Sequence, residues 1–367
     1  MDGVDFGYGL PSEIVAVTPP RLLVGQLQPR NITCRAWNWF QHPVLWFNDG
    51  NLILAVRGTL FRIYRGILCD TSSVFQDMFA LPQPRDNVEM MYGCPVVYLD
   101  DPVEDMVNFL KVLYRGISIA EEIWSPQYWP VTRAMIRLGD KYDAEAVLAR
   151  GEARLMARLP HKIEDWNALY EHFGRPSFQT GKYVEDVIGM VNIGRLRRNK
   201  GVIARALYLC AQLKTRLLLD GCRGADGSRE YLHNDDLACC IDARPGLRAR
   251  NHWLKTTCVF PQRQSSFQCD RCCDKYDAVE HRESMHTLEA GPKTSDPLAH
   301  AGFIRIQCEE YDFCADCTRE FMKKDRKLRQ DFLDDLWNDM FPDGDPREEQ
   351  IVEEMDESEE ETDEDEG

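Results

Sequence analysis

Long apolar runs and a recognisable targeting signal are absent from this sequence. None of its apolar stretches approaches the roughly 18 consecutive residues that a membrane-spanning helix needs. Met1 is followed by neither a basic flank nor the apolar core of a secretory signal. We therefore expect an intracellular protein, in the cytoplasm or the nucleus, with no membrane partner.

Familiar catalytic motifs are also absent. The chain contains no Gly-x-Ser-x-Gly elbow, no phosphate-binding loop, no dinucleotide-binding glycine fingerprint and no His-Glu-x-x-His motif. His161 and His172 occupy helical positions without a carboxylate or cysteine at ligand spacing. The sequence predicts neither an enzyme nor a set of catalytic or cofactor-binding residues, and it favours a protein that acts by binding.

The excess of negative charge is concentrated at the C-terminal end, and the rest of the chain is nearly neutral. The net charge is −17, but residues 343–367 contain 15 acidic residues and one arginine, a net charge of −14. The rest of the chain therefore carries only −3. Its densest basic cluster, between Arg195 and Lys200, is expected to be a solvated helix face. A chain without a broad basic surface is not suited to nucleic acid as a partner.

Residues 49–68 predict a β-hairpin that leads into a helix. The apolar run 51–57 and the alternating run 59–65 are separated by Gly58, as in a hairpin. Apolar residues then recur at helical spacing from Val74 to Phe79. A hydroxyl in the segment 71–73 can cap this helix by accepting its first backbone N–H groups.

A second strand and helix follow. Residues 95–99 form an apolar strand that runs into Asp100-Asp101-Pro102. Asp101 can cap the next helix, and Pro102 suits its first position. The apolar residues of this helix repeat at three- and four-residue steps: Val103, Met106, Val107, Leu110, Leu113 and Tyr114.

Together these motifs resemble the BTB/POZ domain, and most closely its fungal branch. The resemblance rests on Asp49-Gly50 with the strand after it, and on residues 59–68, 72–79 and 105–110. His42-Pro43 matches a dipeptide that often precedes the domain in fungal proteins. This match covers about a fifth of the chain. A looser likeness continues at residues 138–142 and 206–210, and around Cys314, Cys317 and Leu336-Trp337. The resemblance implies an α+β fold, in which helices flank a small sheet.

The same resemblance implies protein partners. BTB domains are used for self-association and for docking as substrate adaptors on cullin-RING ubiquitin ligases. The adaptor use depends on a hydrophobic-x-Glu motif after the helix that ends near Phe79. Here Asn87 stands two residues before Glu89, so the sequence departs from this pattern and disfavours the ligase role. The remaining candidate partners are a second copy of the chain and another protein.

Aromatic residues are dense just before the predicted hairpin, and two interpretations are open. They either cover the core of the domain or form an exposed contact patch, and the first is favoured because exposed rings promote aggregation. The residues are Trp37, Trp39, Phe40, Trp46 and Phe47.

The remaining patterns are mostly helical, and the chain divides into five parts. Helices are predicted at 131–157 (two packed helices), 161–175, 184–196, 202–219 and 321–340. The five parts are an irregular N-terminal segment (1–33), a BTB/POZ-like domain (34–120), a helical appendage (121–254), a cysteine-rich region with an amphipathic helix (255–342) and a disordered acidic tail (343–367).

Seven of the fourteen cysteines fall between Cys258 and Cys317. Cysteines in a chain without a secretory signal are free thiols or metal ligands more often than disulfides. Two Cys-x-x-Cys pairs have the spacing that lets two thiolates bind one metal from a tight turn. The candidate ligands of a structural zinc ion are Cys269, Cys272, Cys314 and Cys317.

Other interpretations of this region are open. Cys273, Cys308, His281, His286 and His300 are alternative ligands, although the region is also compatible with reduced, half-buried thiols. A redox pair would require Cys-x-x-Cys at a helix start that follows a strand. A second functional hypothesis is a nuclear zinc-binding regulator of transcription or chromatin, since some BTB proteins carry zinc modules. Residues 255–319 lack the basic surface and the Cys2His2 spacing that would favour it.

Overall fold

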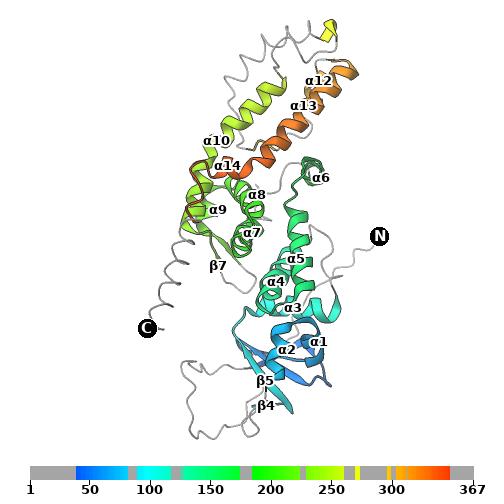
Figure 1. Ribbon diagram of the computed structural model, residues 1–367, viewed down its shortest axis with the longest axis vertical. Coiled ribbons are helices and arrows are strands. Elements are labelled where there is room, and N and C mark those ends of the chain that lie inside the picture. The colour runs from blue at the N-terminus through cyan, green and yellow to red at the C-terminus, as the bar shows by residue number, and fades with distance from the viewer. Residues whose placement is uncertain are drawn as a thin grey trace, which may run out of the picture. The chain divides into compact units, whose positions relative to one another are not determined.

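The chain forms two compact units, residues 1–152 and 153–367. The computed structural model describes residues 39–81, 89–116, 125, 127–173, 184–223, 229–259, 269–272, 296–298, 303–310 and 312–347 (Figure 1). The predicted irregular segment 1–33 and residues 348–367 of the predicted acidic tail lie outside these ranges.

In the described residues, a five-stranded sheet organises the N-terminal unit, with strand order β1-β3-β2-β5-β4. Strands β2 and β3 form the predicted antiparallel hairpin, while β5 pairs with β2 in parallel. At the edges, β1 is parallel to β3 and β4 is antiparallel to β5. The strands are β1 Phe40–Trp46, β2 Leu52–Val56, β3 Thr59–Ile63, β4 Met90–Met91 and β5 Cys94–Leu99.

Five helices accompany the sheet: α1 Arg65–Thr71, α2 Ser73–Ala80, α3 Val103–Arg115, α4 Tyr128–Lys141 and α5 Glu145–Arg158. The last of these continues past the end of the N-terminal unit. Ser72 caps α2 as predicted, because its side chain accepts a hydrogen bond from the backbone N–H of Phe75 at 3.1 Å. The two helices predicted within 131–157 are confirmed as α4 and α5.

The predicted cap of α3 is wrong. Pro102 occupies the N-cap position, and no side chain caps this helix. The carboxylate of Asp101 instead accepts hydrogen bonds from Tyr142 Oη at 2.5 Å and from Lys141 Nζ at 2.6 Å. Both donors come from the end of α4. A contact between distant parts of the chain has therefore replaced the local one.

The two faces of the sheet are covered differently. Alternate residues of a strand point to opposite faces. On the first face, Leu54 and Phe61 pack against helix residues that include Phe75, Phe109 and Met135. The second face carries Ile53, Ala55, Leu60 and Cys94. In the described part of the chain, Trp39, Trp46, Met91 and Val96 pack on this second face.

The dense aromatic segment thus contributes mainly to the core. Trp39 and Trp46 lie on the second face, and Phe47 packs against the first. Phe40, in contrast, is 53% exposed. Trp37 lies outside the described residues.

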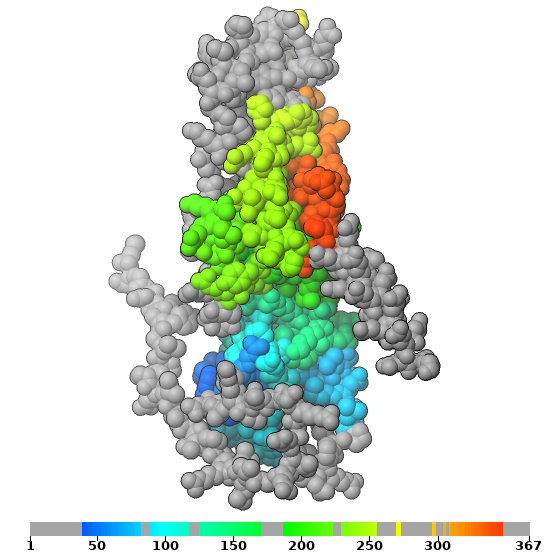
Figure 2. Space-filling view, turned by 90° about the vertical axis from the view of Figure 1, so that its left-hand side faces the viewer, coloured from blue at the N-terminus to red at the C-terminus, as the bar shows by residue number. Residues whose placement is uncertain are grey.

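The C-terminal unit is mainly helical. Its longest helices, α10 and α13, pack side by side (Figures 1 and 2). Its elements are α6 Ile163–Phe173, α7 Val184–Leu196, α8 Lys200–Ala211, α9 Thr215–Asp220, β6 Cys222–Arg223, β7 Arg229–Glu230, α10 Asn234–Val259, α12 Phe303–Glu310, α13 Ala315–Asp334 and α14 Leu336–Met340.

A buried charge network fastens the segment after α14 to α7 and α10. Arg195, at the end of α7, donates to the carboxylates of Asp236 and Asp345, whose side chains are fully buried. Arg347 Nη1 donates to the other oxygen of Asp236 at 2.7 Å. The expectation of a solvated basic face is therefore wrong for Arg195, whose side chain is only 11% exposed.

The coarse architecture agrees with the sequence-based expectation: a mixed α/β chain with an N-terminal sheet, helices after it and a cysteine cluster near the C-terminal end. No helix in the described ranges is both long and apolar enough to cross a membrane.

Candidate metal centre

The four predicted cysteines converge at one point in the C-terminal unit. Cys269 immediately precedes a single helical turn, residues 270–272, which ends at Cys272. Cys314 is the N-cap residue of α13, and Cys317 lies in the first turn of that helix. Two short Cys-x-x-Cys turns, widely separated in sequence, therefore present their sulfurs to one another.

The spacing of the sulfurs matches tetrahedral coordination. All four Sγ atoms lie within 4.8 Å of one another. Cys269 Sγ is 3.8 Å from Cys314 Sγ and 4.0 Å from Cys317 Sγ. A tetrahedral zinc ion with Zn–S bonds of about 2.3 Å holds its sulfurs about 3.8 Å apart. The group could therefore hold a metal ion such as zinc with little rearrangement.

Backbone donors support negative charge on these sulfurs. The N–H of Cys314 donates to Cys272 Sγ at 3.2 Å, and the N–H of Cys317 donates to Cys314 Sγ at 3.5 Å. Hydrogen bonds from the Cys317 backbone and thiol lower the pKa of Cys314 to about 7. Burial has the opposite effect on Cys272 and raises its pKa. A bound cation would favour the thiolate form of both residues.

Apolar side chains pack around the buried cysteines of the site. Cys272 and Cys317 are buried, while Cys269 and Cys314 are partly exposed. Ile304 and Phe321 pack against the buried pair, and Phe313 stacks on Phe321 with ring centroids 5.7 Å apart. Four thiolates leave no open coordination position for water or substrate, so this arrangement suits a structural metal ion rather than a catalytic one.

One alternative ligand lies near the centre without joining the group. Cys308, on α12, is buried in the same apolar cluster, and burial raises the pKa of its thiol. Its position in this cluster was not predicted from sequence, because its spacing to the other cysteines fits no metal-binding motif. Cys273, His281, His286 and His300 lie outside the described residues.

No protein-family model matches this chain, and a search among curated proteins finds no significant relative. Its function has therefore to be inferred from its own residues.

Proposed function

We propose that this chain is a non-enzymatic interaction protein with two functional parts. Its N-terminal unit is a BTB/POZ-like docking module that self-associates, and its C-terminal unit holds a structural zinc ion. The second part provides a rigid helical region in which α13 begins at the metal.

The order and pairing of elements support the BTB/POZ-like assignment. A β2–β3 hairpin is followed by two short helices, and β5 then returns parallel to β2 before α3 begins. The motifs of residues 49–116 predict the hairpin, the helix at α2, the strand β5 and the helix α3, whereas α1 and β4 were not predicted. A parallel return requires a connection across the sheet, which α1 and α2 supply.

The docking proposal rests on the exposed aromatic side chains of the second face of the sheet. Large aromatic side chains line it without being buried: Tyr98 is 48% exposed and Tyr92 is 44% exposed. Tyr98 packs edge-on against Trp39, and Tyr92 packs against Trp46. Aromatic residues and methionine are enriched in protein interfaces. The partner proposed for this face is a second copy of the chain, in keeping with the self-association that the BTB resemblance implies.

Light scattering on the purified full chain tests this proposal. We expect a dimer that Tyr98→Lys converts to a monomer, because a charge placed in an apolar interface has to be desolvated. Val74→Lys is the matched control, since Val74 is also exposed (37%) but lies on α2. A chain that is monomeric at all concentrations would exclude self-association.

The zinc part of the proposal rests on the sulfur geometry. Metal analysis of protein purified without chelator is expected to find about one zinc ion per chain, as four thiolates bind one ion. Protein that retains no metal after saturation with zinc and gel filtration would contradict it.

One observation favours a second candidate function, a zinc-binding regulator that contacts nucleic acid. Beyond the cysteines, α13 exposes four basic side chains, although Arg319 and Arg326 pair with Asp316 and Glu164. The four are Arg319, Lys323, Arg326 and Lys327. Binding to duplex DNA that weakens steeply with salt would support this candidate.

A further inference from the structure

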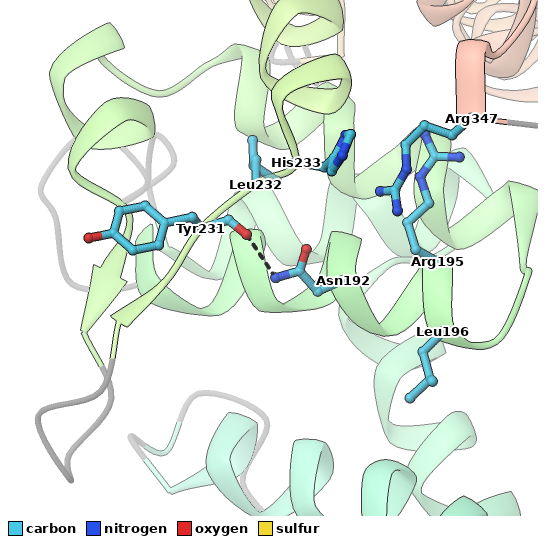
Figure 3. A pocket seen from close by; sticks show the side chains of 7 residues that line it. All are labelled: Asn192, Arg195, Leu196, Tyr231, Leu232, His233 and Arg347. Atoms are coloured by element: carbon cyan, nitrogen blue, oxygen red, sulfur yellow. Dashed lines mark hydrogen bonds between the residues drawn. The ribbon is translucent and has the colours of Figure 1, made fainter. Parts of the chain in front are cut away.

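A pocket of about 550 Å³ opens in the C-terminal unit where the described chain ends (Figure 3). Asn192, Arg195 and Leu196 line it from the end of α7. Tyr231 and His233 line it from the connection between β7 and α10, and Arg347 closes one side. None of the four clustered cysteines lines this pocket.

The polar lining of this pocket is held in place. The Arg195 guanidinium is bound by Asp236 and Asp345, and Arg347 Nη1 is bound by Asp236. Asn192 Nδ2 donates to the backbone oxygen of Tyr231 at 3.1 Å, as the dashed line in Figure 3 shows. The lining is therefore preorganised and does not have to be assembled when a ligand arrives.

Two large apolar side chains line the same pocket while remaining exposed. Leu196 is 52% exposed and Tyr231 is 50% exposed. Among the described residues, the Arg347 guanidinium donates through Nη1, so its Nε and Nη2 can donate hydrogen bonds to an anionic partner. An occupant that satisfies this lining combines apolar side chains with carboxylates.

The chain itself supplies such a segment at this point. Residues 348–355 read Glu-Glu-Gln-Ile-Val-Glu-Glu-Met and follow directly on Arg347. Ile351, Val352 and Met355 are the last apolar residues of the chain, and the 12 residues after them have none. Four residues of extended chain span about 14 Å, so Ile351 can reach the pocket without displacing Arg347.

We propose that residues 348–355 bind in this pocket within the same molecule. Ile351 and Val352 pack against Leu196 and Tyr231, and the flanking glutamates face Arg347 and the exposed imidazole of His233. The pocket is thus a site for short peptides that combine acidic and apolar residues, and the chain's own tail occupies it. Residues 356–367 extend beyond it.

Hydrogen–deuterium exchange on the full chain tests this proposal. Amides of residues 350–355 are expected to exchange at least about tenfold more slowly than those of 358–366, because a bound segment is protected. Leu196→Ser is expected to abolish this difference. Leu219→Ser is the matched control, since Leu219 is 54% exposed on α9 and does not line the pocket.

Equal exchange rates along the whole of 348–366 in the unaltered chain would overturn the proposal. Protection that is lost to the same degree in Leu196→Ser and Leu219→Ser would also overturn it. Protection that appears only as the protein concentration rises would show that the tail of a second copy fills the pocket, and would overturn binding within one molecule. An unchanged melting temperature of both variants verifies that the fold is intact.

Discussion

The sulfur of Cys269 lies 3.8 Å from the sulfur of Cys314, although 45 positions separate the two residues in sequence. Ordering the chain between them costs conformational entropy. Four thiolates held this close also repel one another. A bound cation removes the repulsion and compensates for the ordering, so folding around α13 is expected to depend on metal.

Substitution of the buried ligands is expected to remove the metal. Cys272→Ser and Cys317→Ser each leave three thiolates and a hydroxyl, which binds zinc weakly, so metal content is expected to fall from about one ion per chain to near zero. The measurement is elemental analysis after gel filtration. Chelation of the unaltered chain is expected to lower its melting temperature.

Cys308→Ser is the matched control for the metal-ligand variants. Cys308 is buried in the same apolar cluster but does not belong to the group of four. Its substitution is expected to leave metal content unchanged. Equal metal loss in all three variants would indicate a general packing defect and would contradict the assignment of the ligands.

Acid is expected to destabilise the N-terminal unit through His42. Burial, followed by the positive charges of Lys111 and Arg115, lowers the pKa of His42 to about 4. Its Nδ1 accepts hydrogen bonds from the backbone N–H groups of Val44 and Leu45, which requires an unprotonated nitrogen. The unfolded chain binds this proton near pH 6.5. Stability is therefore fully present above pH 6.5 and is lost as pH falls towards 4.

Denaturant unfolding at a series of pH values between 7 and 4 measures this effect. His42→Asn keeps an acceptor near the position of Nδ1 but does not titrate. Its stability is expected to fall less steeply with acid than that of the unaltered chain. Parallel pH profiles for the two proteins would rule out His42 as the source.

Loss of Arg195 is expected to destabilise the C-terminal unit strongly. Arg195→Met leaves the buried carboxylates of Asp236 and Asp345 without their shared guanidinium. Removing one partner of a buried ion pair costs about 3–5 kcal/mol. The measurement is the free energy of unfolding in denaturant.

The control for this variant is an ion pair at the surface. Arg216 pairs with Asp220 at 2.8 Å, but its side chain is 84% exposed. Arg216→Met is expected to cost under about 0.5 kcal/mol, since solvent screens the pair. A similar cost for both variants would show that burial of the charge network contributes little.

Ser72→Ala is expected to destabilise the N-terminal unit by about 1–2 kcal/mol, because the variant loses the cap of α2. The same hydroxyl also donates to the backbone oxygen of Tyr142, at the end of α4. Ser73 is the neighbouring control, whose hydroxyl donates to Asp143 at the surface. Thermal unfolding of the two alanine variants is expected to show a much larger loss for Ser72. Equal losses would place the stabilising role outside the cap.

Local sequence patterns predicted the helices and strands whose ends are set by residues nearby in sequence. The hairpin needs positive φ angles at its turn, and Arg57 and Gly58 adopt φ values of 42° and 90°. The helix predicted at 184–196 is α7, with the same bounds. Residues 202–219, predicted as one helix, are broken between α8 and α9.

A distant side chain satisfies the backbone oxygens at that break. Arg244, on α10, donates to the backbone oxygens of Ala211 at 3.1 Å and of Leu213 at 2.7 Å, where α8 ends. It also donates to Thr215 Oγ1, at the start of α9. No pattern within residues 202–219 shows that a guanidinium from another helix satisfies these carbonyl groups.

The amino-acid order by itself determined the hairpin, most of the helices and the two Cys-x-x-Cys turns, because each depends on residues a few positions apart. Only the tertiary structure decided which distant groups meet. It brought the two cysteine turns together, buried Arg195 between two carboxylates and drew Asp101 away from the helix start that it was predicted to cap. Such contacts depend on how whole elements pack, and burial then decides the strength of each charge and hydrogen bond.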